Sequence, residues 1–168
     1  MARETATLDH LSHGRLIRGV GLGASTNNEL EQFGEIVDPR ERARRLDDGL
    51  MRLTEFWAGE FEPRPLQTPR IPVWVAARWP HPRPLERAAR WDGVFPIGLP
   101  GPEALAEIAT EIAEKRDQSQ GTFDVVVDLE PGVDLAPWQH AGATWILTDL
   151  GPQPRAAHAR DLIERGPL

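Results

Sequence analysis

The sequence predicts an α/β protein in which about five parallel strands alternate with helices. Short runs rich in β-branched and aromatic residues recur along the chain, and most are separated by segments whose apolar residues repeat at helical spacing. Strands that alternate with helices form βαβ units, whose right-handed crossovers make the strands parallel. The pattern alone does not separate an open, doubly wound sheet from part of a barrel.

Five segments have the composition of strands. The second of them is almost continuously apolar, which is typical of a strand buried on both faces. We expect Trp74 and Trp145 to pack between the sheet and the helices. The predicted strands are LIRGVGL (16–22), IPVWVAA (71–77), DGVFPIG (92–98), FDVVVDLE (123–130) and ATWILTDL (143–150).

Helices are predicted before, between and after these strands. The clearest start signal is Asp38 as N-cap, followed by Pro39 at the first helical position and by Glu41, which is placed for a capping box. Gly59 is the expected end of that helix. The other helices are expected at the N-terminus, over 85–91 after a proline-rich loop at 78–84, from Gly101 onward, around Trp138 and over roughly 153–165.

The bulk composition indicates a single domain spanning residues 1–168. The net charge of −7, from 19 basic and 26 acidic residues, argues against a nucleic-acid partner, which would need clustered Lys and Arg. The absence of cysteine excludes disulfides, thiolate metal sites and cysteine nucleophiles. With no signal peptide or membrane-spanning run apparent, we expect a soluble, cytoplasmic protein.

Three ordered segments resemble the bacterial luciferase-like family of flavin-dependent monooxygenases. They are ATLDHLSHGRLIRGVGLG (6–23), FGEIVDPRERARRLDDGLMRLTEFWAGE (33–60) and PRIPVWVAARWPHPRPLERAARWDGVFPI (69–97). The resemblance implies part of a (β/α)8 TIM barrel, with no counterpart of the family's first three β/α units. It also implies FMN, or alternatively a deazaflavin coenzyme, bound at the carboxyl ends of the strands.

The resemblance places the cofactor phosphate in the loop after the strand at 71–77. In this sequence the loop residues are Ala77, Arg78, Trp79 and onward to Arg83. A helix N-terminus offers unpaired N–H groups to an anion, and either arginine could add a charge-assisted contact. Prolines at 80, 82 and 84 remove three of those N–H donors, so side chains would have to replace them. The alternative is a rigid loop with solvated arginines.

A second candidate cofactor-binding segment is GVGLGAS (19–25). Its glycines would allow the backbone to approach a flat ligand, and Gly23, Ala24 and Ser25 are the residues expected nearest to it. Ser25 or Asn27 could donate a hydrogen bond. The alternative is an ordinary turn at the end of a strand, because a lone Gly-x-Gly is weakly specific.

Other polar groups are interpreted as structural. Ser12 lies between His10 and His13 in a helix end and turn, at what the resemblance implies is the opposite end of the barrel, and Asp9 and Arg15 are expected to hold that turn. No histidine has a second ligand at metal spacing, so no metal is expected. The acidic and basic residues of the helix after Asp38 are expected to form an ion-paired, solvated face. No catalytic residue is assigned.

The expected function is therefore a monooxygenase or oxidoreductase acting on a small organic substrate. FMN would support oxygenation with O₂, and a deazaflavin would support hydride transfer. The alternative is a catalytically inactive remnant or an interaction module of the same fold. The unpaired edges of an incomplete barrel predict a homo-oligomer, or completion by another chain.

Overall fold

A computed structural model of the chain describes residues 1–23, 28–59, 62–117 and 120–166. Its centre is one five-stranded sheet in which every neighbouring pair is parallel. The strands are shorter than the sequence pattern predicts, by one to four residues each, because their ends pass into turns. They are β1 (Arg18–Val20), β2 (Val73–Arg78), β3 (Gly93–Ile97), β4 (Asp124–Leu129) and β5 (Trp145–Thr148).

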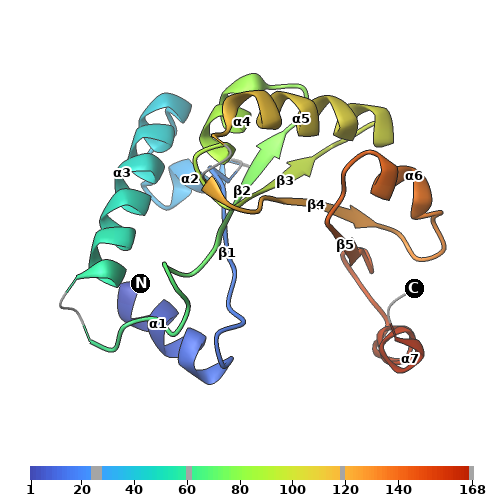
Figure 1. Ribbon diagram of the computed structural model, residues 1–168, viewed down its shortest axis with the longest axis horizontal. Helices are drawn as coiled ribbons and strands as arrows, with labels where there is room; N and C mark the ends of the chain where they lie inside the picture. Colours follow the sequence, from blue (N-terminus) through green and yellow to red (C-terminus); the bar gives the residue numbers. More distant parts are fainter. Residues whose placement is uncertain (24–27, 60–61, 118–119, 167–168) are drawn as a thin grey trace.

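The strand order settles the architecture that the pattern left open. The spatial order is β1-β2-β3-β4-β5, the same as the order in the sequence. A doubly wound sheet reverses its strand order at a switch point, whereas a barrel adds each strand beside the previous one. The chain therefore forms a curled half-barrel, which confirms the prediction of a partial TIM barrel with intervening helices (Figure 1).

Helices precede, connect and follow the strands. The long helix α3 begins as predicted: the Asp38 carboxylate accepts hydrogen bonds from the N–H groups of Arg40 and Glu41. The helices are α1 (Ala2–Leu11), α2 (Glu29–Gln32), α3 (Pro39–Ala58), α4 (Pro82–Ala88), α5 (Pro102–Lys115), α6 (Ala136–His140) and α7 (Ala156–Arg165).

Three local features differ from the sequence prediction. Helix α4 begins at Pro82 and not near residue 85, since proline is favourable in a first helical turn. The short helix α2 had no clear pattern. The capping box does not form, because the Glu41 carboxylate instead binds the guanidinium groups of Arg44 and Arg45, whose hydrogen bonds lower its pKa to about 2.

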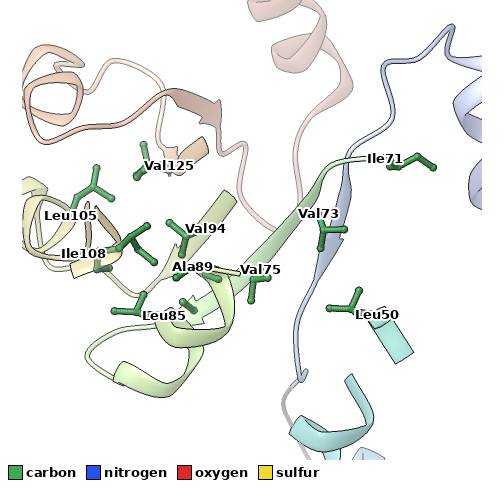
Figure 2. Packing of buried hydrophobic residues seen from close by; sticks show 14 of the residues in the cluster. Leu50, Ile71, Val73, Val75, Leu85, Ala89, Val94, Leu105, Ile108 and Val125 are labelled. Atoms are coloured by element: carbon green, nitrogen blue, oxygen red, sulfur yellow. The ribbon is translucent and has the colours of Figure 1, made fainter. Parts of the chain in front are cut away.

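The hydrophobic core lies between the sheet and helices α3, α4 and α5. Alternate residues of β2 point to this outer face, so that Val73, Val75 and Ala77 are fully buried. Figure 2 shows Val75 and Val94 among side chains of α4 and α5. Apolar residues at helical spacing, Leu105, Ile108 and Ile112, cover β3 and β4 from α5.

The inner face of the sheet has a different composition. Trp74 is paired in register with Gly19 on one side and Gly93 on the other, and Gly93 is paired with Asp124. The Asp124 carboxylate accepts hydrogen bonds from the indole N–H groups of Trp74, at 3.0 Å, and Trp145, at 3.1 Å. Both tryptophans thus lie on the inner face, and the expectation that they pack between sheet and helices was wrong.

Polar contacts hold the amino-terminal end of the half-barrel together. At the amino end of β1, the buried Asp9 carboxylate accepts hydrogen bonds from the N–H groups of Leu66 and Gln67 and from the Gln67 side chain. At the start of β2, Asp92 binds Arg70 and the N–H of Val73. These contacts join the connector before β2 to α1 and to β3.

Candidate functional site

The candidate site lies at the edge of the sheet formed by the carboxyl ends of β1 and β2, which we call the mouth. Because the strands are parallel, residues 21–23 after β1 meet Arg78, at the end of β2, and residues 79–84 after it at this edge. Helices α3 and α4 run back along the outer face of the sheet, so the first turn of each helix lies at the mouth. Ligands of parallel α/β folds bind at this end of the strands.

A pocket of about 580 Å³ opens between these segments. Its walls are largely apolar, and three guanidinium groups stand around it. The lining residues are Leu22, Pro39, Arg40, Ala43, His81, Pro82, Arg83, Pro84 and Arg87. A pocket of this size, with apolar walls and a few cationic groups, suits a small organic ligand that carries an anionic group.

Four arginines at the mouth have no carboxylate partner in the ranges that the structure describes: Arg40, Arg42, Arg78 and Arg83. A Cβ at Gly23 would lie 3.0 Å from a terminal nitrogen of Arg42, and one at Gly98 would lie 3.9 Å from a terminal nitrogen of Arg78. We call these four side chains the basic mouth. In a chain of net charge −7, this local excess of positive charge favours an anion.

The neighbouring arginines, Arg87 and Arg90, share one carboxylate partner, Asp47. Arg87 is only 8% exposed and makes a bidentate contact with Asp47 at 2.7 and 3.0 Å, and Arg90 binds the same carboxylate. The hydrogen bond from Arg87, with the charges of both arginines, holds the pKa of Asp47 below its ordinary value. Arg87 therefore joins α4 to α3 and is not available to a ligand.

Main-chain donors are scarce in the loop after β2. Prolines occupy positions 80, 82 and 84. The N–H of Trp79 donates to the carbonyl of Ile97, and the N–H of His81 donates to the carbonyl of Arg78. In the first turn of α4 only Arg83 and Leu85 retain N–H groups. An anion bound here must therefore be held mainly by guanidinium side chains.

The predicted cofactor residues occupy different environments. Arg78 and Arg83 are exposed at the mouth, whereas the Ala77 side chain is buried against the helices, and Trp79 packs against the edge of the hydrophobic core. Gly23 has φ of +69°, a left-handed conformation that favours glycine. Ala24, Ser25 and Asn27 lie outside the described residues.

Sequence reasoning missed Arg40 and Arg42 as part of the site. They were assigned to an ion-paired helix face, and that prediction is confirmed for Arg44 and Arg45, which bind Glu41. Arg40 and Arg42 instead lie in the first turn of α3. The signal was positional: a helix that follows a parallel strand begins at the carboxyl end of the sheet.

The segment around Ser12 is structural. Its hydroxyl donates to the carbonyl of Asp9 and accepts from the N–H of Arg15, and a ring nitrogen of His10 lies 2.7 Å from the carbonyl oxygen of Arg64. Across the described part of the chain, no three His, Asp or Glu side chains gather in a geometry suited to a metal ion. Among those same residues, no helix has the length and apolarity needed to cross a membrane.

The curled sheet of parallel strands, with a pocket at their carboxyl ends, corresponds to part of an α/β barrel. The model of the luciferase-like monooxygenase family matches residues 1–136, and the chain belongs to that family. The family prediction made from the sequence is thereby confirmed.

Relatives of the chain include both flavin and deazaflavin proteins. A protein of Mycobacterium tuberculosis is 32% identical over 98% of this chain and 63% of its own length. The F420-dependent glucose-6-phosphate dehydrogenase 1 of Rhodococcus jostii is 28% identical over 96% of this chain and 53% of its own length. The oxygenase component of the flavin-dependent trigonelline monooxygenase of Acinetobacter baylyi is 33% identical over 48% of this chain and 26% of its own length.

Among solved structures, monooxygenase RslO1 of Streptomyces bottropensis superposes with a TM-score of 0.62 at 22% identity, covering 84% of this chain and 49% of that one. This likeness concerns the fold. The Mycobacterium and Rhodococcus relatives each match nearly all of this chain. The chain, in turn, covers between about half and two thirds of the length of those relatives.

Proposed function

We propose that the basic mouth binds the phosphate of a flavin cofactor, FMN or alternatively a deazaflavin, in a monooxygenase or oxidoreductase that acts on a small organic substrate. The observation that carries the proposal is the set of unpaired guanidinium groups of Arg40, Arg42, Arg78 and Arg83 beside an apolar pocket at the carboxyl ends of parallel strands. Arginine is suited to phosphate because its planar donors bind two oxygens at once.

The residues present fit a phosphorylated flavin in two respects. The unpaired arginines match a dianion, and the apolar walls contributed by Leu22, Ala43 and three prolines match an uncharged carbon chain or ring. Gly21 and Gly23 carry no side chain after β1: a Cβ at Gly21 would lie 3.1 Å from Cβ of Ala76, and one at Gly23 would lie 3.0 Å from a terminal nitrogen of Arg42. The flavin would supply the redox chemistry, while the protein would orient it and exclude water.

The cofactor type follows from neither the pocket nor the relatives. The Acinetobacter relative is named as flavin-dependent and the Rhodococcus relative as F420-dependent. We take FMN as the first candidate and the deazaflavin as the second, as the sequence resemblance suggests. A catalytically inactive module of the same fold is the competing proposal, and the three prolines that remove N–H donors from the loop after β2 favour it.

The test compares each phosphorylated cofactor with a counterpart that lacks the phosphate. Residues 1–168 are titrated with FMN, riboflavin, F420 and the phosphate-free F420 chromophore, with cofactor fluorescence as the readout. We expect one phosphorylated cofactor to bind and its phosphate-free counterpart to bind at least about tenfold more weakly, since charge-assisted contacts are lost. If each phosphorylated cofactor bound no more tightly than its phosphate-free counterpart, or if none of the four ligands bound, the proposed function would be wrong.

A further inference from the structure

One wall of the pocket at the mouth contains a charged group that the proposed phosphate site does not use. Arg87 and Ala43 both line this pocket, and a terminal nitrogen of Arg87 lies 3.4 Å from the carbonyl oxygen of Ala43. Asp47 follows Ala43 by about one turn of α3, farther from the mouth, and does not line the pocket. The Arg87 guanidinium therefore bridges the pocket wall and a carboxylate behind it.

The Asp47 carboxylate compensates the charge of Arg87. It accepts hydrogen bonds from Nε of Arg87 at 2.7 Å and from a terminal nitrogen of the same guanidinium at 3.0 Å, and Arg90 adds a third contact. These contacts keep the carboxylate ionised, because they hold the pKa of Asp47 below its ordinary value. Arg40 and Arg83 line the same pocket without a carboxylate partner in the ranges that the structure describes. The pocket thus contains two uncompensated guanidinium groups and one compensated group.

A phosphate in the pocket and the Asp47 carboxylate would compete for the same guanidinium. Both kinds of anion favour bidentate contacts with arginine, and the carboxylate already occupies two nitrogens of Arg87. Replacing the carboxylate by an amide of the same shape would leave the charge of Arg87 uncompensated at the pocket wall. Anions should then bind more tightly, and the gain should increase with the charge of the ligand, because the Coulomb energy is proportional to that charge.

We propose that Asp47 is a positioning residue for the pocket, which holds Arg87 and withholds its charge from a bound anion. Phosphate is then held by the basic mouth, and its affinity depends on a carboxylate that does not touch the ligand. This inference rests on the proposed function, since it places an anion in the pocket. It differs from a merely structural role, which predicts that loss of the Asp47 charge weakens the binding of every ligand along with the fold.

The first test measures a series of ligands of increasing charge with Asp47→Asn. In riboflavin, the monomethyl ester of FMN and FMN itself, the phosphate is absent, singly charged and almost doubly charged at about pH 8. We expect Asp47→Asn to leave riboflavin binding unchanged and to tighten binding of the ester by about threefold and of FMN by about tenfold. Flavin fluorescence measures the binding. An unchanged or weaker affinity for FMN, or the same change for all three ligands, would overturn the inference.

Two further variants identify the source of the gain. Asp48→Asn removes the same charge from the next residue of α3, whose partner Arg44 lies on the exposed face, and should not change FMN binding. The double variant with Asp47→Asn and Arg87→Gln should lose the gain, because the uncompensated guanidinium is removed. An equal gain with Asp48→Asn, or a gain that persists in the double variant, would show that Arg87 is not its source.

The double variant also decides the matter if Asp47→Asn does not fold. It removes both charges of the pair together, so its affinity for FMN should stay within about threefold of that of the unsubstituted protein. A loss of about tenfold or more, in a variant that circular dichroism shows to be folded, would mean that Arg87 itself binds the anion, and would overturn the inference.

Inorganic phosphate separates this inference from the proposed function, because its binding requires no flavin. Isothermal titration calorimetry measures it at the same pH. If the unsubstituted protein bound no flavin, the proposed function would be wrong, but Asp47→Asn should still bind phosphate about tenfold more tightly than the unsubstituted protein does. If flavin bound as proposed and the phosphate affinity of Asp47→Asn were unchanged, the proposed function would stand and the role of Asp47 would be refuted.

Discussion

The indole of Trp74 occupies the space that a side chain at Gly93 would need. A Cβ at Gly93 would lie 2.5 Å from Cδ1 of Trp74 and 2.9 Å from the carbonyl oxygen of Asp124. The missing side chain lets the indole extend across β3 and donate its N–H to the Asp124 carboxylate. The same carboxylate binds Trp145, so one polar cluster joins β2, β4 and β5 across the inner face.

We predict that Gly93→Ala lowers the free energy of unfolding by roughly 1–3 kcal/mol, because the indole must move and lose its hydrogen bond. Urea denaturation followed by circular dichroism measures the effect. Gly19→Ala is the matched control, since Gly19 is the other register partner of Trp74 and a Cβ there meets nothing within 4 Å. Equal destabilisation by both substitutions would show that the indole does not depend on the space at Gly93.

The Asp47–Arg87 ion pair is predicted to make stability sensitive to acid. The pKa of Asp47 is lowered in the folded protein, chiefly by the hydrogen bond from Arg87. Its contribution is therefore complete above the unfolded value of 3.8 and is lost as the pH falls through the lower folded value. Asp47→Asn should lower the free energy of unfolding by roughly 1–3 kcal/mol at pH 7, and the difference from the unsubstituted protein should shrink below about pH 4.

The neighbouring residue Asp48 provides the control for that prediction. Asp48 binds Arg44 on the exposed face of α3, where its side chain is 57% exposed. Asp48→Asn should therefore change stability by no more than about 0.5 kcal/mol. If both variants behaved alike over the pH range, the buried position of Arg87 would not explain the effect.

Substitutions in the basic mouth should act on phosphate binding alone. Arg78→Ala and Arg83→Ala are each predicted to weaken binding of the phosphorylated cofactor by roughly tenfold to a hundredfold, with little change in unfolding free energy, since both side chains are exposed. Arg52→Ala removes an exposed arginine of α3 outside the pocket and should have no effect. Fluorescence titration at two salt concentrations measures the change. An effect of Arg52→Ala as large as the others would indicate a general charge effect.

The buried Asp9 carboxylate is predicted to fix the connector before β2. Asp9→Ala would leave the N–H groups of Leu66 and Gln67 without their acceptor, and we expect a loss of about 2–4 kcal/mol in unfolding free energy. Hydrogen exchange of those two amides should accelerate more than exchange in β3. Uniform acceleration across the sheet would mean that Asp9 stabilises the fold without acting on the connector.

Much of the fold could be predicted from the sequence because its signals are local. Strand composition located all five strands, and Asp38 and Pro39 located the start of α3. The face on which Trp74 lies could not be read from composition, since a strand with apolar residues on both faces gives no alternation. Only the register with Gly93 and Asp124 shows that the indole points inward.

The position of the loop after β2 was predictable from the sequence, but the arginines that surround it were not. The strand-to-helix loop after β2 was located from a resemblance, and it does lie at the carboxyl end of the sheet. Arg40 and Arg42 come from a helix some forty residues earlier in the sequence than that loop. Their place in the candidate site depends on tertiary structure, and on which neighbouring arginines the carboxylates of Glu41 and Asp47 bind.

The sequential strand order has a consequence for how the protein folds. In the described ranges, each strand forms backbone pairs only with the strands adjacent to it in the sequence, so no pairing has to wait for a distant part of the chain. Structure can begin at the well-packed centre around β2 and β3 and extend outward one βα unit at a time, as in repeat proteins. For the same reason, a further βα unit can be added beside either outer strand of the sheet without rearranging the βα units already in place.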